Sequence, residues 1–190
     1  MRVLAGALKG RRLVTPRGST TRPTADQVRI ALMDTLTPRL PDARLLDLFA
    51  GAGGVGFEAL SRGAAHVTFV ERDARAVAAL RTNVETLGVA AQTRVERAEV
   101  ATGLARLGRE GARFDLVFLD PPYAGAAEAA AQLLPALAPH LAETASARIV
   151  FEHDRRVTLP DQFGDLRCAD RRRYGDTAVS FYAMTPGVAP

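Results

Sequence analysis

The amino-acid sequence predicts an α/β fold: a doubly wound, seven-stranded, Rossmann-like sheet with an antiparallel last strand and a small basic extension at the N-terminus. Three observations predict this class. From residue 44 onward, short apolar runs alternate with Ala-, Leu- and Arg-rich stretches of helical character, which is typical of a parallel sheet covered on both faces. A glycine-rich turn follows the first run. Near the C-terminus, two further runs flank a short turn, which predicts a hairpin.

The expected elements follow in order along the chain. The predicted parallel strands are Arg44–Phe49, His66–Glu71, Thr93–Glu96, Phe114–Asp120 and Arg148–Glu152. The predicted helices between and after them are Val55–Arg62, Asp73–Leu87, Val100–Arg109 and Ala126–Leu141. The closing hairpin pairs Leu166–Arg173 with Thr177–Ala183 around the turn Tyr174–Asp176.

The N-terminal residues have a different character. Leu4–Val14 mixes apolar and basic residues around glycines and predicts a short hairpin, which a Thr-, Pro- and Gly-rich loop follows. Thr24–Leu36 predicts a helix with Thr24 as its N-cap. We therefore expect a basic extension over residues 1–40 and a main domain over residues 41–190.

Composition narrows the class of protein. The 190 residues, of which 47% are hydrophobic, are enough to bury one sizeable core. No apolar run is long enough to span a membrane, no secretory signal is evident, and the single cysteine, Cys168, excludes an internal disulfide. We therefore expect a cytoplasmic protein with no membrane partner.

Basic charge is concentrated at the N-terminal end. Residues 1–29 carry seven basic side chains and one acidic side chain, a net charge of +6, whereas the whole chain has a net charge of +4. Such a segment beside a nearly neutral body is typical of a polyanion-binding arm. A solvated surface in an arginine-rich protein is the alternative, and charge alone leaves both open.

The glycine-rich turn spans Ala50–Gly56 and contains G-x-G-x-x-G, with Glu71 twenty residues beyond Gly51. These features are typical of a dinucleotide site, so a nicotinamide oxidoreductase is one candidate. Asp47 favours S-adenosylmethionine (SAM) instead, because SAM has a cationic end, whereas a pyrophosphate needs the bare N–H groups of a helix N-terminus. Glu71 suits a ribose in either interpretation. Glu99, after the third strand, is a candidate for the adenine amine or a solvated surface residue.

The decisive motif is Asp120-Pro121-Pro122-Tyr123, at the end of the fourth apolar run. Two prolines stiffen the backbone and remove N–H donors, which leaves carbonyls, a carboxylate and an aromatic ring. If Asp120 and the Pro121 carbonyl accept the two hydrogens of an exocyclic base amine, the lone pair of that amine turns toward a methyl donor, while Tyr123 stacks on the base. This chemistry requires neither a covalent nucleophile nor a metal, and the histidines show no metal-ligand spacing.

On these motifs the sequence resembles the RsmD-type methyltransferases, which modify a guanine N2 of 16S ribosomal RNA. The resemblance covers nearly the whole chain. Besides the glycine turn and the Asp120 motif, it rests on Arg22-Pro23-Thr24, Glu58–Ala64 and Tyr174–Ala178. The sequence departs from the family pattern at Gln27, Ile30 and Glu99, which concerns RNA and adenine contacts and leaves the catalytic motif intact.

The resemblance implies a SAM-dependent RNA methyltransferase whose partner is ribosomal RNA, in the small subunit or in an assembly intermediate of it. It assigns catalysis to Asp120, Pro121 and Tyr123. The expected cofactor contacts are Asp47, Phe49, Ala50, Gly51, Gly53, Glu71, Arg72, Ala98 and Glu99. The expected RNA contacts are Arg2, Lys9, Arg11, Arg12, Arg22, Thr24, Arg29, Arg172, Arg173 and Tyr174.

Two other classes stay open at this point. The same acceptor motif suits adenine N6 and cytosine N4, so a DNA methyltransferase is an alternative, although the short chain leaves little room for a sequence-reading domain. A non-catalytic RNA-binding assembly factor with a SAM fold is another, and the intact Asp120 motif argues against it. Protein-glutamine methyltransferases typically carry Asn in place of Asp120.

Overall fold

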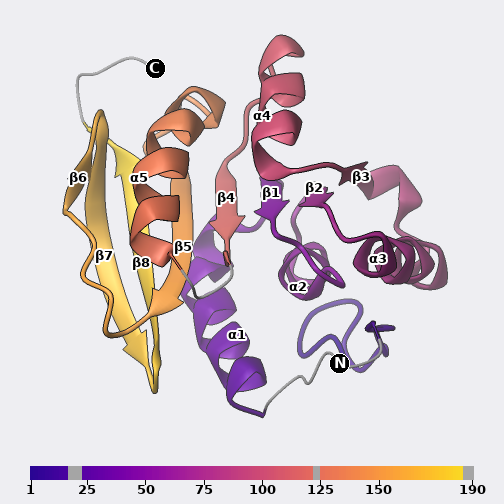
Figure 1. Ribbon diagram of the computed structural model, residues 1–190. Helices are drawn as coiled ribbons and strands as arrows, with labels where there is room; N and C mark the ends of the chain where they lie inside the picture. The colour runs from indigo at the N-terminus through magenta and orange to yellow at the C-terminus, as the bar shows by residue number, and fades with distance from the viewer. Residues whose placement is uncertain (17–22, 122–124, 186–190) are drawn as a thin grey trace.

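The computed structural model describes residues 1–16, 23–121 and 125–185, with the backbone alone over residues 23–26. These residues form one eight-stranded sheet in the order β3-β2-β1-β4-β5-β8-β7-β6 (Figure 1). The strands are β1 (Arg44–Leu48), β2 (His66–Glu71), β3 (Thr93–Arg97), β4 (Leu116–Leu119), β5 (Arg148–Asp154), β6 (Gln162–Phe163), β7 (Leu166–Tyr174) and β8 (Thr177–Met184). The first five are parallel, and β8 runs antiparallel to both β5 and β7.

The order of the strands reverses beside β1. The chain moves outward from β1 to β2 and β3, and then returns to place β4 on the other side of β1. In doubly wound sheets, ligands bind at such a switch point, in the crevice beyond the carboxyl ends of the strands. The glycine-rich turn after β1 and the Asp120 motif after β4 both lie at this point.

Helices cover both faces of the sheet (Figure 1). One face carries α1 (Pro23–Leu36), α2 (Gly54–Ser61) and α3 (Ala74–Leu87), and the other carries α4 (Val100–Arg109) and α5 (Ala126–Leu137). Short 3-10 turns occupy Thr37–Arg39, Ala90–Gln92 and Ala138–His140. Capping residues fix both ends of α3. The Asp73 carboxylate accepts two backbone N–H groups of the first helical turn, and Gly88, with φ +72°, ends the helix. Among the described residues, no helix combines the length and apolarity that crossing a membrane requires.

The predicted doubly wound sheet with its closing hairpin is confirmed, and the differences lie at the ends of elements. Helix α1 begins at Pro23, so Thr24 lies inside the helix and is not its N-cap. Helix α5 ends at Leu137, before the predicted end at Leu141. The N-terminal residues form a loop closed by a single bridge between Arg2 and Arg12, not a regular hairpin. The two-residue strand β6 extends the expected seven strands to eight.

The described part of the N-terminal 40 residues shares the core of the sheet. Val3 and Leu13 of the loop and Leu32, Met33 and Leu36 of α1 are at most 5% exposed. They belong to the same apolar cluster as the side chains on the α1 face of the central strands. The basic extension is therefore packed as part of one hydrophobic unit.

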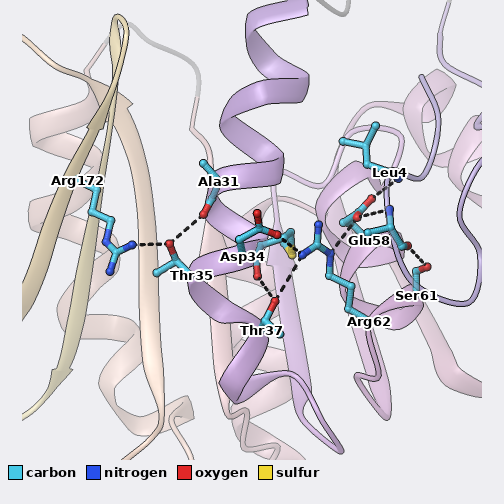
Figure 2. A network of polar contacts seen from close by, with 11 residues as sticks. Leu4, Ala31, Asp34, Thr35, Thr37, Glu58, Ser61, Arg62 and Arg172 are labelled. Atoms are coloured by element: carbon cyan, nitrogen blue, oxygen red, sulfur yellow. Dashed lines mark hydrogen bonds and ion pairs between the residues drawn. The ribbon is translucent and has the colours of Figure 1, made fainter.

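Buried Glu58 of α2 ties the N-terminal loop to the rest of the fold (Figure 2). Its carboxylate accepts the backbone N–H groups of Leu4 and Ala5, at 2.7 and 2.9 Å, and the Nε–H of Arg62 at 3.0 Å. Arg62 also donates to Asp34 of α1 at 2.6 Å. The loop, α1 and α2 are thus held by one polar network.

The same row of contacts reaches the closing hairpin (Figure 2). Arg172 of β7 donates to the Thr35 hydroxyl of α1 at 2.6 Å, and its guanidinium lies 5.9 Å from the centre of the Phe181 ring. Helix α1 is consequently linked to α2 on one side and to β7 on the other.

We expect Glu58→Gln to destabilise the protein by about 3 kcal/mol, because an amide cannot satisfy two N–H donors and a nearly buried arginine together. For a chain of this size, that corresponds to a fall in Tm of about 6–12 °C in thermal unfolding followed by circular dichroism. Glu85→Gln, on the exposed side of α3, is the control and should change Tm by no more than about 1–2 °C, in line with about 0.5 kcal/mol for surface sites. Equal Tm values for the two variants would contradict this role of Glu58.

Candidate active site

Strand β1 carries Asp47 and Phe49 to the switch point. Asp47 is only 2% exposed, and its Oδ2 accepts the N–H of Gly56 at 3.0 Å. Phe49, the first residue after the strand, has φ +59°, a left-handed conformation that costs a bulky residue about 1–3 kcal/mol. Strain of this kind is found mainly where proteins bind ligands or catalyse reactions.

The glycine-rich turn is held against the sheet by acidic side chains. The N–H of Gly51 donates to Glu71 Oε2 at 2.8 Å, and the N–H of Gly56 donates to Asp47. A Cβ atom at Gly56 would lie 2.3 Å from the Phe69 ring, so only glycine lets α2 pack this closely on β2. The turn therefore directs two of its N–H donors at carboxylates of the protein itself.

Two cavities meet at the strand ends. The first, here called the β3-side cavity, has a volume of about 330 Å³, and the second, the α1-side cavity, has about 510 Å³. Both are bordered by Phe49, Glu71 and Asp120. Of the cofactor contacts expected from the sequence, Arg72, Ala98 and Glu99 line the β3-side cavity, and Asp47, Ala50 and Gly51 line the α1-side cavity. Gly53 lines neither and begins α2 at φ +83°.

Glu71 and Glu99 occupy different environments in the β3-side cavity. Glu71 accepts the Asp73 N–H through Oε1 at 2.8 Å in addition to the Gly51 N–H, so backbone donors fix its carboxylate. Glu99 pairs with Arg72 at 3.3 Å, and both side chains are 65% exposed. Exposed ion pairs of this kind are weak, so both side chains are free to rearrange around a ligand.

The α1-side cavity is strongly acidic. Its lining includes Asp47, Glu71, Asp73, Asp120 and Glu152, and Arg29 is the only basic residue in the described part of that lining. Burial raises the pKa of Asp47 well above its usual range, and the charges of Asp120 and Glu71 add to this effect. Such a cavity favours a cationic ligand group and opposes a phosphate.

Asp120, the first residue of the Asp120 motif, lies at the rim shared by the two cavities. Asp120 is open to solvent on the cavity side, yet the surrounding protein removes enough water to raise its pKa to about 6. Pro121 is buried and lines the β3-side cavity. Pro122 and Tyr123 lie outside the described residues, so the stacking role expected for Tyr123 stays a prediction.

Glu152 is a site residue that sequence reasoning missed. Leu119 of β4 pairs with Phe151 of β5, so Asp120 and Glu152 follow at the same level of adjacent parallel strands. Burial and the charge of Asp120 raise the pKa of the Glu152 carboxyl to about 8. The sequence did hold one indication of this role. Glu152 ends the predicted strand Arg148–Glu152, just as Asp120 ends the predicted strand Phe114–Asp120.

The expected RNA contacts fall into two exposed groups. Arg2, Lys9, Arg11 and Arg12 are exposed on the N-terminal loop, although Arg11 also donates to the Thr86 carbonyl. Arg172 and Arg173 are exposed on β7, with Tyr174 half-buried beside them. The backbone of Thr24 lies in the first turn of α1, and Arg22 lies outside the described residues.

Arg29, which is expected to contact RNA, is buried, and its RNA contact stays a prediction. It is 8% exposed and lines the α1-side cavity from α1. Its Nη2 donates to the Arg2 carbonyl at 3.0 Å, and its Nη1 lies 2.9 Å from the Met1 sulfur. It occupies this position because it lies three and four residues before buried Leu32 and Met33, on the inward face of the helix. Its charge therefore acts inside the molecule.

Sequence comparisons find similar proteins over most of this chain. The family described as "Conserved hypothetical protein 95" matches residues 1–183. The Bacillus subtilis protein "Putative rRNA methyltransferase YlbH" is 38% identical over 96% of this chain and 98% of its own length. The Escherichia coli protein "Ribosomal RNA small subunit methyltransferase D" is 40% identical over 65% of this chain and 60% of its own length.

Solved structures share the architecture. A hypothetical protein of Thermus thermophilus superposes with a TM-score of 0.80 at 33% identity, covering 95% of this chain and 98% of that one. The structure described as "SMU.776, a putative methyltransferase complexed with SAH" gives a TM-score of 0.70 at 14% identity, covering 85% of this chain and 50% of that one. At that identity the second likeness concerns the fold alone.

We expect the contribution of Glu152 to stability to fall as the pH rises from about 5 to about 8. The folded protein holds the Glu152 proton up to about pH 8, whereas an unfolded chain releases it near pH 4.5, so the contribution of the protonated group is lost across this window. The Glu152→Gln variant has no proton to release at this position. Between pH 5 and pH 8 its Tm, measured by thermal unfolding, should fall less than the Tm of the wild type, by at least about 2–4 °C, equivalent to about 1 kcal/mol. Glu143→Gln, at an exposed carboxylate, should follow the wild-type profile. Parallel profiles for wild type and Glu152→Gln would rule out this burial effect.

Proposed function

The chain belongs to the Conserved hypothetical protein 95 family of RsmD-like, SAM-dependent methyltransferases, and we propose that it transfers a methyl group from SAM to the exocyclic N2 amine of a guanine in 16S ribosomal RNA. The observation that carries the proposal is the position of Asp120 at the rim between the two cavities, beside the glycine-rich turn, with Pro121 next to it in the lining of the β3-side cavity. A ribosomal substrate would place the protein in the cytoplasm. The names of the relatives support ribosomal RNA as the substrate class.

The residues at the strand ends fit SAM better than a dinucleotide. The turn's Gly51 and Gly56 N–H groups are engaged by Glu71 and Asp47, so they are not bare donors awaiting a pyrophosphate. The acidic side chains of the α1-side cavity match the positive charge that SAM carries at its amino and sulfonium groups. In this proposal Glu71 holds the ribose and Asp47 acts near the cationic end. The remaining cofactor contacts are those predicted from the sequence.

The chain's part in the reaction is alignment. SAM supplies a methyl group bonded to a sulfonium, which is an excellent leaving group, so no covalent nucleophile is required. Asp120 and the Pro121 carbonyl accept the two hydrogens of the amine and direct its lone pair. Asp120, whose pKa is about 6, is mostly ionised at neutral pH and is available as an acceptor for the proton that the amine loses on methylation. Tyr123 is proposed to stack on the base.

Residues 1–40 and the hairpin arginines are proposed to bind RNA. The exposed basic side chains of the N-terminal loop provide phosphate contacts, which are the main source of affinity for a nucleic acid. Arg172, Arg173 and Tyr174 offer a second basic surface on β7. The network through Asp34 and Arg62 links α1, which lies between these two surfaces, to the loop.

Methyl transfer is tested with radiolabelled SAM and, in parallel, ribosomal small subunits, free 16S RNA and DNA. We expect label in N2-methylguanosine with a ribosomal substrate. Asp120→Ala should lower the rate at least about 1,000-fold, about 4 kcal/mol, because the amine loses its alignment. SAM affinity measured by calorimetry should stay within a few fold. Full activity of Asp120→Ala would refute the alignment, and label in adenine or cytosine would refute the guanine assignment.

RNA binding should depend on the loop charges. Replacing Lys9, Arg11 and Arg12 together with Ala should weaken binding to small-subunit RNA and reduce the slope of log K against log salt by about 2, since each phosphate contact contributes about 0.7–0.9. Arg109→Ala, at the C-terminal end of α4, is the control and should leave the slope unchanged. An unchanged slope in the triple variant would place the RNA surface elsewhere.

A further inference from the structure

We propose that Glu152 is a specificity-determining residue that accepts the ring N1–H of the target guanine while Asp120 holds its N2 amine. This inference rests on the proposed function and adds to it a reason for choosing guanine. Nothing in the sequence pattern or in the Asp120 motif assigns a role to Glu152.

The register of the sheet places the two carboxylates side by side. Leu119 and Phe151 are paired partners on parallel strands, and Asp120 and Glu152 are the residues that follow them. Neighbouring strands lie about 4.8 Å apart, so these two side chains lie within reach of two adjacent atoms of one small ring. Both line the α1-side cavity, together with Asp47 and Phe118.

The Glu152 side chain is half-buried, and its carboxylate has no hydrogen-bond or ion-pair partner in the part of the protein that the structure describes. Among the described residues, no hydrogen bond and no ion pair involves its carboxylate oxygens, whereas Asp47 and Glu71 are each fixed by backbone N–H groups. A half-buried carboxylate without a partner loses part of its hydration, which disfavours its charged form. The elevated pKa of Glu152 reflects that cost. A ligand that enters the cavity and donates a hydrogen bond to Glu152 would remove this free-energy cost.

The donor that suits this position belongs to guanine. The N2 amine of guanine has a ring donor, N1–H, on one side and a ring acceptor, N3, on the other, so guanine alone of the three bases offers a ring donor beside its amine. The N6 amine of adenine and the N4 amine of cytosine are flanked by ring nitrogens that carry a lone pair and accept hydrogen bonds. An ionised carboxylate only accepts, so it binds N1–H of guanine and repels the ring nitrogens of the other two bases. A positive charge on the cofactor and the N1–H donor both favour the ionised form of Glu152.

The test compares two bases that carry the same N2 amine but differ at the ring position N1. Small-subunit particles are reconstituted with 16S RNA that carries, at the nucleotide labelled by the wild type, either guanine or 2-aminopurine, which keeps the N2 amine but has an acceptor at N1. Assays run at pH 8.5, above the pKa of about 8 at Glu152. For the wild type we expect kcat/KM to be about 100-fold higher for guanine, as an unpaired buried polar group predicts.

Glu152→Gln should lower kcat/KM for guanine about 10- to 100-fold and reduce the preference over 2-aminopurine at least about 10-fold, because an amide can donate to N1 of the analogue. Asp154→Asn, a carboxylate-to-amide change on the same strand at a residue that pairs with Arg156, is the matched control and should keep the wild-type preference. The change in the ratio is the readout, because the two bases differ in intrinsic reactivity.

The remaining outcomes would overturn either the role of Glu152 or the proposed function. A preference in Glu152→Gln within about 3-fold of the wild type would overturn the role of Glu152, even if the rate falls. A loss of SAM affinity of about 10-fold with an unchanged preference would assign Glu152 to the cofactor and also overturn it. Label from the wild type in a base other than guanine would refute the proposed function itself, and calorimetric binding of SAM by Glu152→Gln shows that the variant is folded.

Discussion

The site depends on the hydrogen bonds by which Asp47 and Glu71 hold the glycine-rich turn against the sheet. Each carboxylate lies at the carboxyl end of its strand and accepts an N–H of the turn. The same two side chains therefore fix the connection from β1 to α2 and contribute to the acidic lining of the cavity. Close packing of Gly56 on Phe69 completes the arrangement, because α2 cannot approach β2 with a larger residue there. The strained backbone of Phe49 is maintained between these fixed points.

A second constraint arises from the concentration of acidic groups. Asp47, Asp120 and Glu152 line one cavity from three neighbouring strands, in surroundings that raise the pKa of each. Their mutual repulsion disfavours full ionisation of the ligand-free site. A ligand with positive charge relieves this repulsion, which gives the cavity a physical basis for selecting a sulfonium compound over an anionic dinucleotide.

Much of this arrangement could be predicted from the sequence, because it follows from local patterns. The strand His66–Glu71 and the helix Val100–Arg109 have the predicted bounds. The glycine-rich turn, Asp120 and Pro121 lie at the expected edge of the sheet. Glu152 and Arg29 could not be predicted. The importance of Glu152 depends on the β4–β5 register, and the burial of Arg29 depends on which side of α1 meets the sheet. Strand β6 is too short to produce a periodic signal.

The shared packing of residues 1–40 has a consequence for how such a protein can diversify. Val3, Leu13 and the apolar face of α1 complete one layer of the core, so the segment that carries the basic charge cannot be exchanged as an independent module. New substrates would have to be acquired through point changes at solvent-facing positions of the loop, while its inward positions stay apolar. Descendants with altered targets are therefore expected to keep the length and spacing of this segment and to differ in the charges that it displays.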